Sequence, residues 1–381
     1  MATWIPTTGI ASRQRLDDVL IVDLDVHLHD SPEVIAPYCE QPWRDVLLSG
    51  QGVPPYGGAT RLFPNFPGQW EPRRPVSLDP RTLRADLDAL SIDLPVLFPE
   101  GFLGIARQPD AAYALAITRA YNRWLVEEYL GTRGFLGGII ACPQDPEGAA
   151  REIAQYASHP HVVCVILPAS GLSVFWGDRR YDPIYAAAER HDLAVLYHAG
   201  GALSLPTLGF DTRQYDSWFM QHTFSHNIAM MTNCANVLAT GVPARYPGLR
   251  MIYIEAGISW AAQAMTRLDW AWERHRADVP LLTEPPSAYM RRQMWYATQP
   301  IEEPADLRDM ADVFRIVGEG SILFASDYPH HDFDHPKKVW DIPVSPEAKR
   351  GIMGENAVRS LRLPPSVLAE RVPERASVAA D

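Results

Sequence analysis

Eight short apolar runs, rich in β-branched residues, restrict the fold of this chain more than any other feature. They cover residues 19–25, 93–98, 134–141, 161–167, 193–198, 249–255, 292–297 and 321–326. Several are apolar on both faces, which is typical of parallel strands covered by helices. The sequence therefore predicts a buried parallel sheet.

Segments with helical periodicity separate these runs. In residues 110–130, for example, apolar side chains recur three and four positions apart. Eight strands that alternate with helices favour a closed (β/α)8 TIM barrel in the α/β class. The alternative is a doubly wound open sheet, which often carries a glycine-rich phosphate loop after its first strand. This chain has HLHDSPEV there, so we prefer the barrel.

The chain length suits one barrel domain with insertions. It has 381 residues, and we expect residues 1–365 to form that domain. Residues 30 to about 80 are rich in Pro and Gly and lack clear periodicity. Long loops of this kind often cover active sites, so we predict a cap insertion over the C-terminal mouth of the barrel. Residues 366–381 are expected to form a C-terminal extension.

Charge and hydropathy argue against several classes of partner. The net charge of −12 disfavours nucleic acids and anionic membranes. No run approaches the roughly 18 apolar residues of a membrane helix, and the N-terminus lacks the apolar core of a signal peptide. The four cysteines have no paired spacing, so we expect buried free thiols. These features predict a cytoplasmic protein.

Side chains of metal-ligand type follow three of the predicted strands. Asp25 and His27 end the first run and point to the same face, because they are two residues apart. His198 ends the fifth run, and Asp327 follows the eighth. An aspartate alone could cap a helix, and a histidine alone could be an ordinary core residue. Together, at strand ends where barrel enzymes place their chemistry, they predict a divalent metal site, with Zn²⁺ preferred over Mn²⁺.

Four segments resemble the amidohydrolase-related family, also called amidohydrolase 2. They are VDLDVHLHD, YDPIYAAAERHDLAVLYHAG, VPARYPGLRMIYIEAGISW and ILFASDYPHHDFDHP, within a resemblance over about residues 20–360. The branch resembled contains aminocarboxymuconate-semialdehyde decarboxylase and γ-resorcylate decarboxylase. The resemblance implies that the metal ligands are Asp25, His27, His198 and Asp327. It also implies a homo-oligomer, a dimer or larger.

Glu255 departs from the pattern of the decarboxylases in that family. They carry a catalytic histidine at the end of the sixth strand, where this chain has Glu255. We interpret Glu255 as an acid/base whose pKa is raised by burial near another carboxylate, or as a group that orients His198 or an arginine of the cap. Both interpretations remain open. The change weakens the decarboxylase prediction and leaves hydrolysis or hydration open.

Three more histidines are candidates for the site. His29 could replace Asp25 as a ligand or stand behind the ligands, and we prefer Asp25 because its D-x-H register matches the family. His222 and His226 lie at the start of the helix after the fifth run. The resemblance suggests that His226 faces the substrate, and the alternative is a residue at a helix N-terminus. We place His29 and His222 among the substrate-binding residues.

Glu100 and His330 complete the predicted substrate site. Glu100 follows the second run, and His330 lies three residues after Asp327. A turn in a loop is the alternative for His330.

We expect a metal-dependent hydrolase that acts on a small cyclic or aromatic substrate. A metal-activated water would attack, Asp327 would accept a proton and return it to the leaving group, and Glu255 or His226 would assist. The first alternative is a non-oxidative decarboxylase of an aromatic or unsaturated carboxylic acid on the same metal site. The second is a catalytically idle barrel that acts as a binding protein.

Overall fold

Eight parallel strands form a single sheet in which each strand pairs with the next along the chain. The computed structural model describes residues 16–50, 79–199, 218–330 and 332–371. The strands are β1 (Val22–Leu28), β2 (Leu94–Pro99), β3 (Leu136–Ile140), β4 (Val162–Pro168), β5 (Ala194–His198), β6 (Met251–Ile254), β7 (Met294–Ala297) and β8 (Ile322–Leu323). Each overlaps one of the predicted runs, and the predicted (β/α)8 barrel is confirmed.

The chain that follows β8 closes the barrel against β1. Leu24 N donates to Phe324 O at 3.1 Å, and Asp327 N donates to Asp25 O at 3.0 Å. An isolated parallel bridge joins Val26 to the residue after Asp327. Because this pairing continues past the two regular residues of β8, Asp25 and Asp327 are held side by side at one end of the barrel.

A buried carboxylate ties the same two segments together. Asp23 accepts hydrogen bonds from Ser326 N at 2.9 Å, Ser326 Oγ at 2.5 Å and Asp25 N at 3.1 Å. Burial raises the pKa of Asp23 to about 8. Ser326 thus anchors the exit of the last strand to the beginning of the first.

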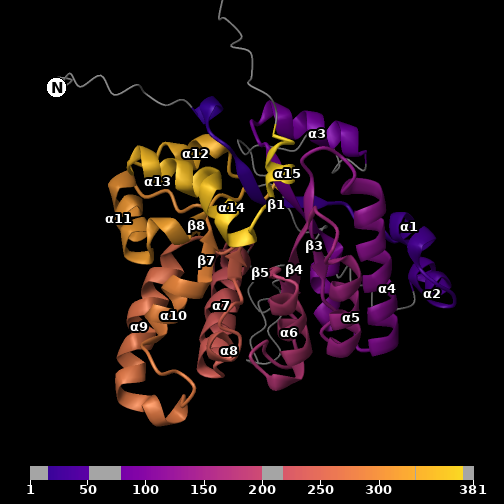
Figure 1. Cartoon of the computed structure of the whole chain (residues 1–381), viewed down its shortest axis with the longest axis horizontal. Coiled ribbons are helices and arrows are strands. Elements are labelled where there is room, and N and C mark those ends of the chain that lie inside the picture. The colour runs from indigo at the N-terminus through magenta and orange to yellow at the C-terminus, as the bar shows by residue number, and fades with distance from the viewer. Residues whose placement is uncertain (1–15, 51–78, 200–217, 331, 372–381) are drawn as a thin grey trace, which may run out of the picture.

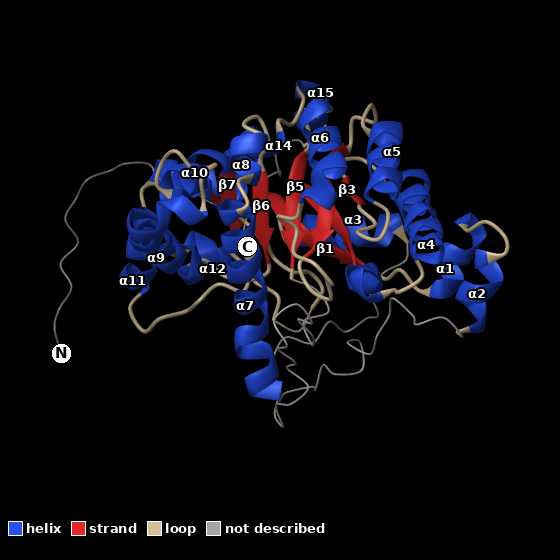
Figure 2. Cartoon of the chain, turned by 90° about the horizontal axis from the view of Figure 1, so that it is seen from below, coloured by secondary structure: helices blue, strands red, loops and turns tan. Residues whose placement is uncertain are grey.

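Helices surround the strands, as Figures 1 and 2 show. The longer ones are α3 (Pro80–Ala89), α4 (Ala111–Trp124), α5 (Pro146–Tyr156), α6 (Asp182–Arg190), α7 (Trp218–Ala239), α9 (Ser259–His275), α10 (Pro286–Gln293) and α11 (Leu307–Val317). Aspartate side chains accept first-turn N–H groups at the starts of α3, α4, α5 and α11, where such a cap contributes about 1 kcal/mol. The turns before these helices are therefore defined by local sequence.

Part of the predicted cap is helical, which the sequence pattern did not indicate. The helices α1 (Pro32–Ile35) and α2 (Trp43–Ser49) lie within residues 30–80. Each has at most two turns, too few for a hydrophobic period to become visible. Residues 51–78 lie outside the described part of the chain, so the covering role stays a prediction, as does the domain boundary near residue 365.

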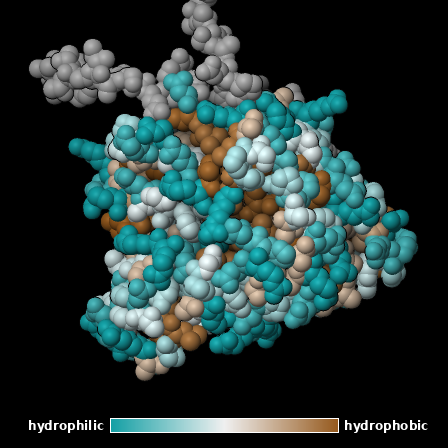
Figure 3. All heavy atoms as spheres, viewed as in Figure 1, coloured by the Kyte–Doolittle hydropathy of each residue, from teal (hydrophilic) through white to brown (hydrophobic). Residues whose placement is uncertain are grey.

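Short helices complete the C-terminal half of the described chain. They are α8 (Val242–Arg245), α12 (Pro336–Trp340), α13 (Pro346–Arg350), α14 (Asn356–Leu361) and α15 (Pro365–Leu368). Polar residues cover most of the face in Figure 3, with apolar residues gathered near its centre. Among the described residues, no helix combines the length and apolarity needed to cross a membrane. All four cysteines are buried and free, as expected.

Candidate metal centre

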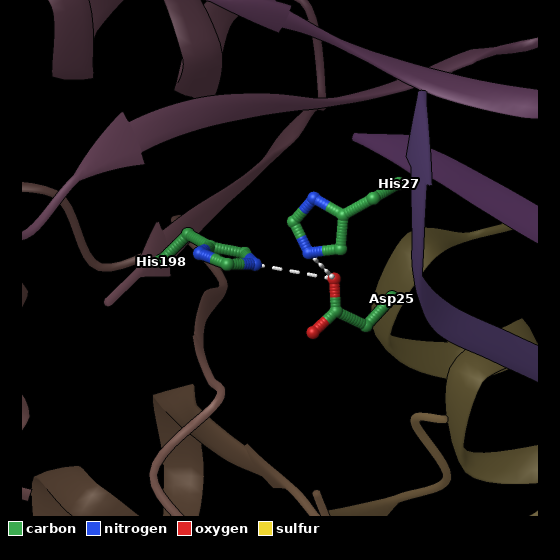
Figure 4. A group of neighbouring side chains, drawn as sticks. All are labelled: Asp25, His27 and His198. Carbon is green, nitrogen blue, oxygen red and sulfur yellow. Dashed lines mark hydrogen bonds and ion pairs between the residues drawn. The ribbon is translucent and has the colours of Figure 1, made fainter. Parts of the chain in front are cut away.

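Asp25, His27 and His198 meet at the C-terminal ends of β1 and β5 (Figure 4). The Nε2 atoms of the two imidazoles approach the same oxygen, Asp25 Oδ1, at 3.2 Å from His27 and 3.1 Å from His198. All three residues are at most 1% exposed. One potential ligand atom from each lies within 4.8 Å of the others, so they can share a single ion.

Asp327 joins this group from the exit of β8. Its Oδ1 atom lies 3.1 Å from His27 Nε2. Its Oδ2 atom accepts a hydrogen bond at 3.2 Å from Nε2 of Gln299, which lies two residues past β7. Because each oxygen of Asp327 has a different neighbour, the orientation of the carboxylate is defined.

The remaining ring nitrogens of the two histidines contact atoms that fix their rotation. Nδ1 of His27 hydrogen-bonds to the carbonyl oxygen of Pro99 at 2.9 Å, so this nitrogen carries the proton in the neutral ring. Nδ1 of His198 lies 3.3 Å from Glu255 Oε2. Both histidines consequently present Nε2 to the carboxylates, which is the arrangement found where a metal-bound imidazole is supported by a carboxylate or carbonyl.

Glu100 and His330 extend the centre on one side. His330 Nε2 hydrogen-bonds to Glu100 Oε2 at 2.6 Å, and its Nδ1 lies 2.6 Å from Asp327 Oδ1. The ring also stacks on His27, with 4.3 Å between centroids. Burial opposes the charge on both, yet the two carboxylates raise the pKa of His330 well above its usual value, and His330 lowers that of Glu100 to about 2. The His330 ring therefore lies between two carboxylates.

Glu255 adds a fourth carboxylate at the end of β6. Burial, followed by the charges of Asp327 and Asp25, raises its pKa well above the usual value. Oε1 of Glu255 lies 3.9 Å from His226 Nε2 on α7, and both residues are less than 10% exposed. Figure 2 shows α7 extending past the strands, which brings its N-terminal half to the end of the barrel where the carboxylates gather.

The electrostatics of the centre fit a bound divalent cation. Burial and His330 would lower the pKa of His27, but Asp25 and Asp327 raise it well above the usual value. Burial alone would raise the pKa of Asp25, and His198 and His27 instead hold it below its usual range. The buried carboxylates of the centre thus favour positive charge beside them, which a divalent cation supplies.

An unpaired oxygen points to the same conclusion. Among the described residues, Asp25 Oδ2 is a buried atom of this centre with no hydrogen-bond partner. Buried polar atoms are rarely left unpaired in folded proteins, and a missing ion is one explanation. The donor set of two imidazoles and two carboxylates suits a divalent transition metal.

The structure brings together most, but not all, of the residues selected from the sequence. Asp25, His27, His198 and Asp327 lie close together, and Glu100, Glu255, His226 and His330 surround them. His29 belongs to none of the possible metal-binding groups in the described residues, because it lies beyond Leu28, where β1 and its alternation end. The side chain of His222 is outside the described part.

Sequence reasoning missed Gln299. It lies in WYATQP, after the seventh run, and a glutamine is not a residue type that a search for ligands or acid/base groups selects. Its position two residues past a strand, at the end of the barrel where the other site residues lie, was the available signal.

A family model described as amidohydrolase matches residues 24–363. This chain belongs to the amidohydrolase family. The resemblance inferred from the four sequence segments is thereby confirmed. So is the expectation that the chain is an enzyme, because the curated relatives of this amidohydrolase are enzymes.

Two curated relatives of this amidohydrolase are decarboxylases. γ-Resorcylate decarboxylase of Rhodococcus jostii (strain RHA1) is 23% identical over 271 residues, which are 66% of this chain and 78% of that protein. 6-Methylsalicylic acid decarboxylase of Penicillium expansum is 24% identical over 268 residues, 64% of this chain and 74% of that protein.

Two solved structures share the fold of this amidohydrolase. 5-Carboxyvanillate decarboxylase from Sphingomonas paucimobilis has a TM-score of 0.68 at 20% identity, over 91% of this chain and all (100%) of that one. Dihydroxybenzoic acid decarboxylase from Polaromonas sp. JS666, with bound manganese and the inhibitor 2-nitroresorcinol, has a TM-score of 0.68 at 18% identity, over 92% of this chain and 99% of that one.

Proposed function

We propose that this amidohydrolase is a divalent-metal-dependent decarboxylase that removes the carboxylate from an aromatic acid. The observation that carries the proposal is the convergence of Asp25, His27, His198 and Asp327 on one buried point. The decarboxylase relatives support this alternative over the hydrolysis that the sequence led us to prefer.

In this proposal Asp25, His27, His198 and Asp327 hold the cation. A divalent cation, when bound, would supply positive charge that holds the substrate carboxylate at this point. We favour Mn²⁺ over Zn²⁺, because oxygen-rich surroundings suit Mn²⁺ and a structural neighbour contains manganese.

Asp327 carries the proton in the proposed reaction. It protonates the ring carbon that bears the carboxylate, the C–C bond breaks, and its electron pair returns to the ring as CO₂ leaves. The proton remains on that carbon. His330 lies 2.6 Å from Asp327 and hydrogen-bonds to Glu100, so it can return a proton from solvent to Asp327.

Glu255 orients His198 in this scheme. Its Oε2 atom lies 3.3 Å from His198 Nδ1 and keeps Nε2 directed at Asp25. Of the two roles left open by the sequence, this contact supports the orienting one.

One observation favours a hydrolase as the second candidate. Glu255 occupies the strand end where the family's decarboxylases carry a catalytic histidine, and burial together with the charges of Asp327 and Asp25 raises its pKa, as suits an acid/base group. A hydrolase would use the same metal residues, so the product of the reaction separates the two functions.

The test measures CO₂ release and product deuteration. The Mn²⁺-loaded protein is incubated in D₂O with 2,6-dihydroxybenzoate, 5-carboxyvanillate and 6-methylsalicylate. A decarboxylase releases CO₂ and places one deuterium on the carbon that lost the carboxylate. His198→Ala should abolish this, whereas His275→Ala, at an exposed histidine of α9, should not.

Hydrolysis would give a different result. A panel of lactones, esters and amides in ¹⁸O-labelled water would then yield labelled acids, with no CO₂ from the aromatic acids. That outcome would contradict the proposed decarboxylase function and support a hydrolase.

A further inference from the structure

Gln299 is a fully buried amide that touches the proposed centre. Its Nε2 atom donates to Asp327 Oδ2 at 3.2 Å, and the residue is 0% exposed. Its Oε1 atom has no hydrogen-bond partner among the described residues. A buried amide with one unpaired atom lowers the stability of the folded protein, so stability does not explain why Gln299 lies here. Its contact with Asp327 therefore requires another explanation.

The backbone of Gln299 is held from both sides. Its carbonyl oxygen accepts from Gly257 N at 3.1 Å, in the turn after β6, and Thr298 N donates to Leu323 O of β8 at 2.9 Å. Two residues on, Ile301 N donates to Asp334 Oδ2 at 2.6 Å. The amide therefore projects from a segment fixed between the exits of β6 and β8.

The orientation of the amide follows from the charge on its neighbour. With Nε2 toward Asp327 the contact is a hydrogen bond to a carboxylate, whereas the flipped amide would place two oxygens against each other. An amide does not titrate in this range, so Gln299 remains a donor at every physiological pH.

We infer that Gln299 is a positioning residue that fixes the rotation of the Asp327 carboxylate so that one of its oxygens faces the metal centre. By occupying Oδ2, it leaves Oδ1 directed at His27 Nε2, 3.1 Å away, and at His330 Nδ1, 2.6 Å away. Without this donor, the Asp327 carboxylate could rotate about its side-chain bonds and turn that oxygen away from His27 and His330. The inference rests on the proposed cation site, and it deepens that proposal by adding a residue that is not itself a ligand.

The test compares two buried glutamines that differ in what they contact. Gln299→Met keeps the length of the side chain and removes the donor to Asp327. Gln293→Met makes the same change at a glutamine of α10 that is 3% exposed and donates to the backbone oxygens of Pro243 and Tyr246. Gln293 therefore controls for the loss of a buried amide.

The readout is Mn²⁺ binding, independent of any substrate. Loss of the free-ion electron paramagnetic resonance signal gives the Kd, and the spectrum of the bound ion reports its surroundings. Gln299→Met should raise the Kd about 10- to 100-fold and alter the bound spectrum, as changes in residues behind metal ligands do. Gln293→Met should bind Mn²⁺ like the wild type, even if it melts at a lower temperature.

Three results would decide against the inference. Equal Mn²⁺ affinity and spectra in Gln299→Met and the wild type would overturn it while leaving the proposed cation site intact. A wild type that binds no Mn²⁺ would overturn the proposed function and this inference together. If Gln299→Met does not fold, Gln299→Asn takes its place, because its shorter amide stays polar but does not reach Asp327. Wild-type Mn²⁺ affinity in Gln299→Asn would also overturn the inference.

Discussion

Glu255 and Asp327 share a left-handed backbone conformation, with φ of 61° at each. They follow β6 and β8, and both carboxylates belong to the same group of potential ligands. For a residue such as glutamate this conformation costs about 1–2 kcal/mol. Such strain persists where the surrounding structure enforces it and is concentrated at functional sites.

Replacing Glu255 by glycine should give a more stable protein than replacing it by alanine. Both changes remove the side chain, but only alanine retains the steric cost of positive φ, so we expect a difference of about 1 kcal/mol in favour of glycine. Thermal and urea unfolding measure it.

A position in a regular helix supplies the control for this comparison. Ala264→Gly in α9 should have the opposite sign and lose about 1 kcal/mol. If Glu255→Ala were as stable as Glu255→Gly, the conformation of Glu255 would not be strained in solution.

Divalent cations should raise the melting temperature of the wild type. A ligand that binds only the folded state contributes about 2.7 kcal/mol at 100 times its Kd. The effect should be large here, because the cation also relieves repulsion among the buried carboxylates of Asp25, Glu255 and Asp327. Differential scanning fluorimetry with Mn²⁺, Zn²⁺ and EDTA measures it.

His198→Ala and His275→Ala are the matched variants for this measurement. The first should lose the cation-dependent shift and the second should keep it. A shift of equal size in both would place the cation elsewhere on the protein.

Asp23 should be important for closure of the barrel. Asp23→Ala would leave two buried N–H groups and the Ser326 hydroxyl without their acceptor, at about 1–3 kcal/mol for each lost partner. Asp23→Asn should cost less, because the amide oxygen can still accept and the raised pKa of Asp23, about 8, means that the folded protein carries it uncharged at neutral pH. Soluble yield and melting temperature should rank the alanine variant well below the asparagine variant, and equal values would show that Asp23 is dispensable.

Asp30 should make the stability depend on pH. It accepts from Gly101 N at 2.8 Å and Phe102 N at 3.1 Å, and burial raises its pKa from 3.8 to about 7. Because the pKa of Asp30 is higher in the folded protein than in the unfolded chain, its contribution to the free energy of unfolding is fully present below about pH 4. This contribution is lost as the pH rises to about 7. The loss is at most about 4 kcal/mol.

The control for Asp30 is Asp79, an aspartate whose pKa is lowered rather than raised. The advantage of the wild type over Asp30→Asn in melting temperature should be smaller at pH 8 than at pH 5. Asp79→Asn, at an exposed helix cap whose pKa is lowered, should differ from the wild type by the same amount at both values. An advantage over Asp30→Asn that grows with pH would contradict the buried, uncharged state of Asp30.

The fold and the four proposed ligands could be predicted because they depend on local patterns. Buried parallel strands are continuous apolar runs, and eight of them separated by helices leave few architectures. Alternation along a strand places Asp25 and His27 on one face, and the common direction of the strands brings His198 and Asp327 to the same end. Neither inference needs knowledge of side-chain rotamers.

The contacts that give these residues their chemistry were decided by tertiary structure alone. The hydrogen bond from Gln299 to Asp327, the position of His330 between Glu100 and Asp327, and the bonds from Ser326 to Asp23 across 303 positions all join different strands. They depend on rotamers, on positive φ and on turns that leave no periodic trace. The sequence by itself determined which residues reach the end of the barrel, and only the packing of the strand exits decided which atoms meet there, because differences of a few tenths of an ångström in distance decide whether two groups form a hydrogen bond.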